Sequence, residues 1–68
     1  MTFSERLKSL RHERNLSQLK LSNEIGLSQS AVAAYEVGKK DPTVFNLCCL
    51  ADYFHVSTDY LLGRTDIK

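Results

Sequence analysis

The feature that most constrains the fold is a junction of only three residues, Gly26-Leu27-Ser28, between two short helical patterns in the middle of the chain. So short a turn makes antiparallel packing of the two helices difficult and favours a crossing near a right angle. Gly26 can adopt the positive φ that the turn needs, and the small side chain of Ser22 lets the helices approach. Apolar residues occupy the inward positions on both sides of the turn: Leu21, Ile25, Leu27, Val32 and Tyr35. The pattern therefore predicts a helix-turn-helix unit.

Three further helical patterns flank this pair, and no segment alternates as a strand would. The first begins with Thr2 and Glu5 in capping-box spacing and runs to about Arg14. Polar residues suited to the N-cap position precede the other four helices: Ser17, Ser28, Thr43 and Ser57. The remaining inward positions are apolar: Phe3, Leu7, Leu10, Leu47, Leu50, Ala51, Phe54, Tyr60, Leu61 and Leu62. We predict a compact all-α domain of five helices over residues 1–63, followed by a short, frayed C-terminal tail at 64–68.

The composition is that of one folded domain, with 68 residues of which 43% are hydrophobic and 25% charged. The N-terminal segment carries Glu5, Arg6 and Lys8 and no apolar run, so we expect no signal peptide and a cytoplasmic location. Net charge is only +1, but it is unevenly distributed. Residues 1–40 hold seven Lys/Arg against four Glu, and residues 41–68 hold two against four Asp. The basic half contains the predicted helix-turn-helix.

No pattern of residues predicts catalysis or a metal site. Cys48 and Cys49 are neighbours on one helix and point about 100° apart, so they cannot easily form a disulfide and are interpreted as reduced. Together with the distant His12 and His55 they do not form a zinc-ligand spacing. The chain also lacks a Gly-rich phosphate loop. We expect no enzyme activity, no cofactor and no bound metal.

Residues 18–42, QLKLSNEIGLSQSAVAAYEVGKKDP, resemble the core of the phage-repressor-like, or XRE-type, helix-turn-helix family. The resemblance continues through LADYFHVSTDYLLG and so covers nearly the whole chain. It implies a lambda-repressor-like fold and a sequence-specific, double-stranded-DNA-binding transcriptional regulator, expected to be a repressor. The third helix, at about 29–36, would lie in the major groove, where it reads base edges with its N-terminal residues.

The resemblance also implies roles for individual residues. Those expected to face bases are Gln29, Ser30, Ala33 and Ala34. Small and polar side chains let a helix come close within a groove about 12 Å wide, where glutamine suits adenine and alanine can touch a thymine methyl. Those expected to contact phosphates are Gln18, Ser28, Lys39 and Lys40. Arg11 and Glu36 are expected to form a structural ion pair.

The chain departs from the family's pattern at several positions. Ala33 and Ala34 stand where relatives often have longer polar or basic side chains, which would make recognition depend more on DNA shape. Ser22 replaces the commoner alanine, and its hydroxyl is expected to bond back to the carbonyl of Gln18. Leu19 stands where a charged residue is more usual, and we interpret it as a single exposed leucine.

One short helix reads only a few base pairs, so we expect a homodimer on a near-palindromic operator, with recognition helices about 34 Å apart. We expect its contact to be weak, so that at low concentration the dimer forms only on DNA. The apolar residues predicted to form the contact, flanked by Cys48, are Val56, Tyr60, Leu61 and Ile67. A different class of function stays open: a protein-interaction module, such as an antitoxin-like partner of another protein, with the same fold. Binding to DNA should weaken steeply with salt, whereas an apolar protein interface should not.

Overall fold

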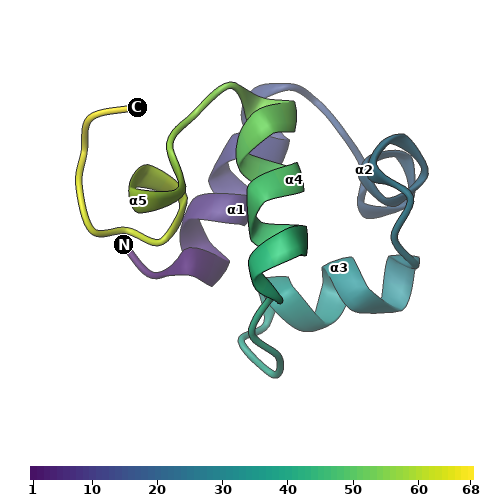
Figure 1. The fold of residues 1–68 in the computed structure, drawn as a ribbon. Helices are drawn as coiled ribbons and strands as arrows, with labels where there is room; N and C mark the ends of the chain where they lie inside the picture. The colour runs from purple at the N-terminus through teal and green to yellow at the C-terminus, as the bar shows by residue number, and fades with distance from the viewer.

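Each helix of the computed structural model, which describes residues 1–68, begins directly after a side chain that caps it (Figure 1). The five caps are the predicted ones, and each side-chain oxygen accepts a hydrogen bond from the backbone N–H three residues later: Thr2, Ser17, Ser28, Thr43 and Ser57. The helices that follow are α1 (Phe3–Glu13), α2 (Gln18–Ile25), α3 (Gln29–Glu36), α4 (Val44–Phe54) and α5 (Thr58–Leu61). There are no strands, so the all-α, five-helix prediction is confirmed.

Residues with left-handed backbone angles end several of these helices. Gly26 has φ +74° at the end of α2, as predicted. Asn15 follows the end of α1 with φ +55°, and His55 ends α4 with φ +56°. Left-handed residues cannot continue a right-handed helix, so these positions set the short connections of the domain.

The core is one cluster to which every helix contributes. Its ten buried apolar residues are Leu7, Leu10, Leu21, Val32, Tyr35, Leu50, Ala51, Phe54, Tyr60 and Leu61. In this arrangement α1 packs against α3 and α5, and α4 packs against α2 and α5. Leu62, which was predicted to point inward, is instead partly exposed at the C-terminal end of α5. The helix is only four residues long, so Leu62 lies just outside it.

The C-terminal tail was predicted to fray, and in the structure it is non-helical and mostly exposed but forms contacts with the rest of the domain. It passes the N-terminus and turns back beside α5 (Figure 1), and the carbonyl of Lys68 accepts a hydrogen bond of 2.8 Å from the backbone N–H of Ser57. The physical reason lies in Arg6, whose guanidinium is buried and stands 3.9 Å from the centroid of the Tyr60 ring. Asp66 in the tail accepts a hydrogen bond of 3.3 Å from Arg6 and so supplies a counter-charge.

Candidate nucleic-acid interface

The turn between α2 and α3 is held by the carbonyl of Ser22, which accepts hydrogen bonds from the backbone N–H groups of Gly26 and Leu27. Ser22 is buried at 1% exposure, as expected for a small residue placed between α2 and α3. Its hydroxyl donates to the carbonyl of Leu19 at 2.7 Å, so the predicted bond to Gln18 is wrong. The Gln18 carbonyl lies one residue further back along the helix, and the hydroxyl bonds the nearer acceptor.

Two sides of α3 differ in exposure as the expected roles require. Val32 and Tyr35 are buried against the core. The residues predicted to face bases are exposed at the start of the helix or half-buried along it: Gln29 and Ser30, then Ala33 and Ala34. Residues three and four apart lie on one helix face, so the structure brings these four together on a single outward surface. We call this set the recognition face.

The residues predicted to contact phosphates lie at or just beyond the ends of α2 and α3. Ser28 caps α3, and its hydroxyl oxygen accepts from the Ala31 N–H at 3.1 Å, which leaves the hydroxyl hydrogen free to donate. Lys39 and Lys40 are exposed directly after α3. Gln18 is the first residue of α2, where backbone N–H groups lack helical partners. Its side chain has a contact that the sequence did not predict, with Glu36.

The predicted ion pair between Arg11 and Glu36 is present and is bidentate. Arg11 Nε donates to Glu36 Oε2 at 2.6 Å, and Nη2 donates to Oε1 at 2.9 Å. The same guanidinium donates from Nη1 to the carbonyl of Leu16 at 2.7 Å. Burial raises the pKa of Glu36, but the hydrogen bonds from Arg11 and Gln18 outweigh it and lower the pKa below its ordinary 4.5. The pair ties α1 to the last residue of the recognition helix.

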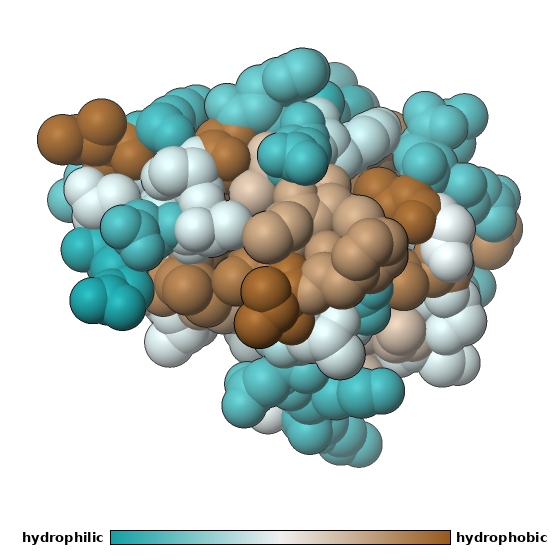
Figure 2. All heavy atoms as spheres, in the orientation of Figure 1, coloured by the Kyte–Doolittle hydropathy of each residue, from teal (hydrophilic) through white to brown (hydrophobic).

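Two of the four residues predicted for the dimer contact, Tyr60 and Leu61, are buried in the core at 7% and 0% exposure, whereas Ile67 is exposed and Val56 is half-buried. Apolar side chains are exposed elsewhere, on the first turns of α4: Val44 at 79% and Phe45 at 74%, with Cys48 exposed beside them. Figure 2 shows hydrophobic atoms gathered where α4 faces the viewer. We call Val44, Phe45 and Cys48 the α4 patch. This patch was not predicted from the sequence. The signal was there, because Val44 and Phe45 are apolar but lie before the inward-facing positions of the helix, which start at Leu47.

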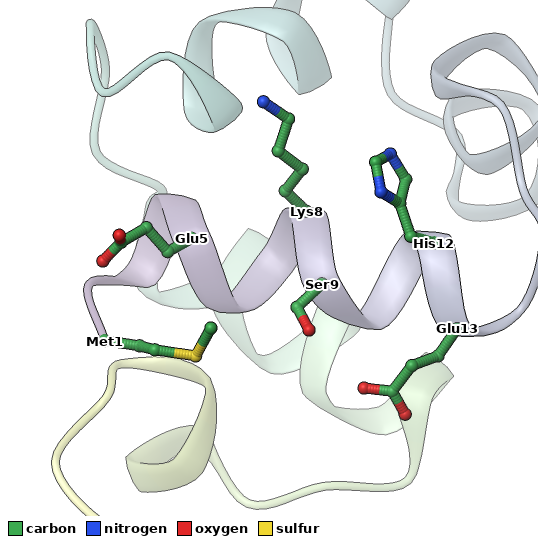
Figure 3. Close-up of a pocket in the computed structure, with 6 residues that line it drawn as sticks. All are labelled: Met1, Glu5, Lys8, Ser9, His12 and Glu13. Carbon is green, nitrogen blue, oxygen red and sulfur yellow. The ribbon is translucent and has the colours of Figure 1, made fainter.

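One open hollow lies along α1, with a volume of about 700 Å³. Its lining residues are Met1, Glu5, Lys8, Ser9, His12 and Glu13. In Figure 3 Lys8 and His12 point to one side of the helix, and Ser9 and Glu13 point to the other. Polar groups that diverge from one helix do not converge on a substrate. Nowhere in the structure do three His, Cys, Asp or Glu side chains gather as metal ligands. None of the helices has the length and hydropathy to cross a membrane.

Residues 7–61 match the family model HTH_3, described as helix-turn-helix. The chain is 38% identical over 64 residues to the uncharacterized HTH-type transcriptional regulator YobD of Bacillus subtilis, covering 94% of this chain and 57% of that protein. It is 39% identical, with the same coverage, to the cryptic phage CTXphi transcriptional repressor RstR of Vibrio cholerae. The chain thus spans about half the length of the curated relatives that it matches.

A similar fold occurs in the P22 c2 repressor protein, solved in complex with a synthetic operator. The TM-score is 0.88 at 28% sequence identity, over 96% of this chain and 98% of that one. A transcriptional regulator from Listeria innocua gives a TM-score of 0.85 at 34% identity, over 91% of this chain and 58% of that one.

Proposed function

The chain belongs to the HTH_3 helix-turn-helix family, and from this premise we propose that it is a sequence-specific, double-stranded-DNA-binding transcriptional regulator that acts as a repressor. The observation that carries the proposal is the recognition face. It presents small and polar side chains on a short helix whose opposite side is anchored in the core. The P22 c2 repressor, which shares this fold at 28% identity, was solved bound to an operator.

In this proposal α3 enters the major groove with its N-terminal end foremost. Gln29 offers a donor and an acceptor together, which matches the edge of adenine, and Ser30 can bond to several bases. Ala33 and Ala34 keep the helix backbone close to the groove and offer methyl groups to thymine. Because the alanines form no hydrogen bonds through their side chains, part of the selectivity comes from the shape of the DNA.

Contacts to the DNA backbone hold the helix in register. Gln18 and Ser28 stand at the N-terminal ends of α2 and α3, where free N–H groups and the helix dipole favour an anion. Lys39 and Lys40 add two positive charges beyond the other end of α3. We infer no catalytic activity and no cofactor, since the proposed roles need only binding groups.

We further propose that the protein binds a near-palindromic operator as a homodimer, with the α4 patch as its contact. Burying Val44 and Phe45 against a second copy would remove apolar surface from water without disturbing the core. A twofold dimer that reads two successive major grooves on one side of a duplex has to place its α3 helices about 34 Å apart. A patch this small would pair weakly off DNA.

Selection from random duplexes at defined salt tests the proposal. We expect a preferred site, with affinity that falls steeply as salt rises because phosphate contacts release counterions. Gln29→Ala should cost about 1–3 kcal/mol on that site and relax preference at one base pair. Lys39→Ala should weaken all sequences alike and lower the salt slope by about one. Lys68→Ala, which removes an exposed lysine of the tail, is the matched control and should leave the affinity and the salt slope unchanged.

Failure to select any duplex would refute the proposal and favour the protein-interaction class. Selection of a site that Gln29→Ala binds with unchanged affinity and base preference would leave DNA binding standing but remove Gln29 from base recognition.

A further inference from the structure

Three helices meet at the carboxylate of Glu36, the last residue of α3. Arg11 of α1 donates to both of its oxygens, and Gln18 of α2 donates from Nε2 to Oε1 at 3.2 Å. The Glu36 side chain is only 1% exposed, while Gln18 is half-buried at the domain surface. The carboxylate is therefore shared between a structural partner and a residue proposed to contact DNA.

The chemistry of these groups fixes the orientation of the Gln18 amide. An ionised carboxylate only accepts hydrogen bonds, so the NH₂ group of the amide must face Glu36 and the amide oxygen cannot. The NH₂ group has two hydrogens, of which Glu36 takes one. The second hydrogen remains for an acceptor at the surface. If the Gln18 amide were rotated by 180°, its oxygen would face the Glu36 carboxylate, and neither group could donate a hydrogen bond to the other.

We infer that Glu36 is a positioning residue for DNA binding, which acts through Gln18 by holding its amide so that the free N–H faces a phosphate oxygen. This rests on the proposed function and deepens it. Without Glu36 the Gln18 side chain would spend part of its time in other rotamers or with its amide turned over, and the contact would weaken. The hydrogen bond also links Gln18, the proposed contact of α2 with the DNA backbone, to the last residue of α3.

A double-mutant cycle on the preferred duplex separates this role from a structural one. The variants are Gln18→Ala, Glu36→Gln and the double variant, with affinities calculated per folded protein after denaturant unfolding of each. Losing a hydrogen bond to a charged group corresponds to a loss of about tenfold in affinity, which we expect for Gln18→Ala. Glu36→Gln should cost less than that but more than about twofold, because only one acceptor oxygen remains to hold the Gln18 amide. In the Gln18→Ala background, Glu36→Gln should then cost less than about twofold. Base preference should not change in any variant, because the contact is to the DNA backbone.

Additive losses in the cycle would overturn the inference, since Glu36 would then act independently of Gln18. The unaltered protein supplies a second measurement if Glu36→Gln does not fold. In its NMR spectrum one side-chain amide proton of Gln18 should be protected from exchange in the free protein, and the second should become protected on adding duplex. Two equally unprotected protons in the complex would also overturn it. A protein that binds no duplex at all refutes the proposed function, and that result is distinct from additivity in a protein that binds.

Discussion

Replacing the buried Arg11 by alanine should destabilise the domain far more than removing an exposed positive charge. Arg11 is the partner of a carboxylate whose side chain is 1% exposed, and the substitution leaves that charge stranded. Removing one member of a buried ion pair costs about 3–5 kcal/mol. The Leu16 carbonyl also loses its donor, at about 1 kcal/mol more. Domains of this kind have a free energy of unfolding of about 5–15 kcal/mol, so the loss approaches the whole stability of a domain at the low end of that range.

Arg14→Ala is a useful comparison, although it should also lower the stability to a smaller extent. Arg14 donates to the carbonyls of Tyr53 and Phe54, both at 3.1 Å, and so satisfies groups at the end of α4. Arg14 is exposed, so we expect a loss of about 1 kcal/mol. Lys20→Ala is the neutral control, because Lys20 is exposed on α2 and forms no ion pair. Its effect should lie within about 0.5 kcal/mol of zero.

Thermal and urea unfolding followed by circular dichroism measure the difference. At about 4–8 °C per kcal/mol for a domain of this size, Arg11→Ala should lower Tm by about 16 °C or more. At acidic pH the difference in Tm between Arg11→Ala and Arg14→Ala should become smaller. The pKa of Glu36 is lowered in the folded state, so the pair stabilises the fold fully above about pH 4.5 and progressively less as pH falls through that lowered pKa. Equal Tm values for Arg11→Ala and Arg14→Ala at pH 7, or a gap that does not change in acid, would refute the reasoning.

Two further predictions concern assembly and backbone. Phe45→Glu should abolish cooperative binding of two copies to a two-half-site duplex in sedimentation, while Ile67→Glu, equally exposed but on the tail, should not; the reverse result would return the contact to the C-terminal surface. Gly63→Ala should destabilise the domain more than Gly26→Ala in urea unfolding. Both glycines have positive φ, but only at Gly63 would the new Cβ overlap backbone, that of Met1, whereas Gly26 borders open space. Equal losses would mean that the two chain ends are not packed together.

The helix boundaries and the turn could be predicted from the sequence because they depend on local interactions. An N-cap such as Ser17 bonds to an N–H only three residues away, so the same short stretch of sequence holds both partners. The left-handed turn at Gly26 likewise depends on the residue itself. Helical periodicity decides which residues share a side of α3, but the assignment of base contacts to the recognition face came from the family resemblance. The Arg11–Glu36 pair came from the family resemblance and not from any local pattern.

Other features depended on contacts between residues far apart in the sequence, which only the tertiary structure decides. The spacing of Tyr60 and Leu61 fits either an inward or an outward position on a short helix, and packing against the rest of the core buried them. The tail was predicted to fray, yet Arg6, sixty residues earlier, holds it through Asp66. The Gln18–Glu36 bond spans eighteen residues. Caps and turns are thus determined by the sequence itself, because their energies come from neighbours; burial and long-range hydrogen bonds exist only once the helices have packed.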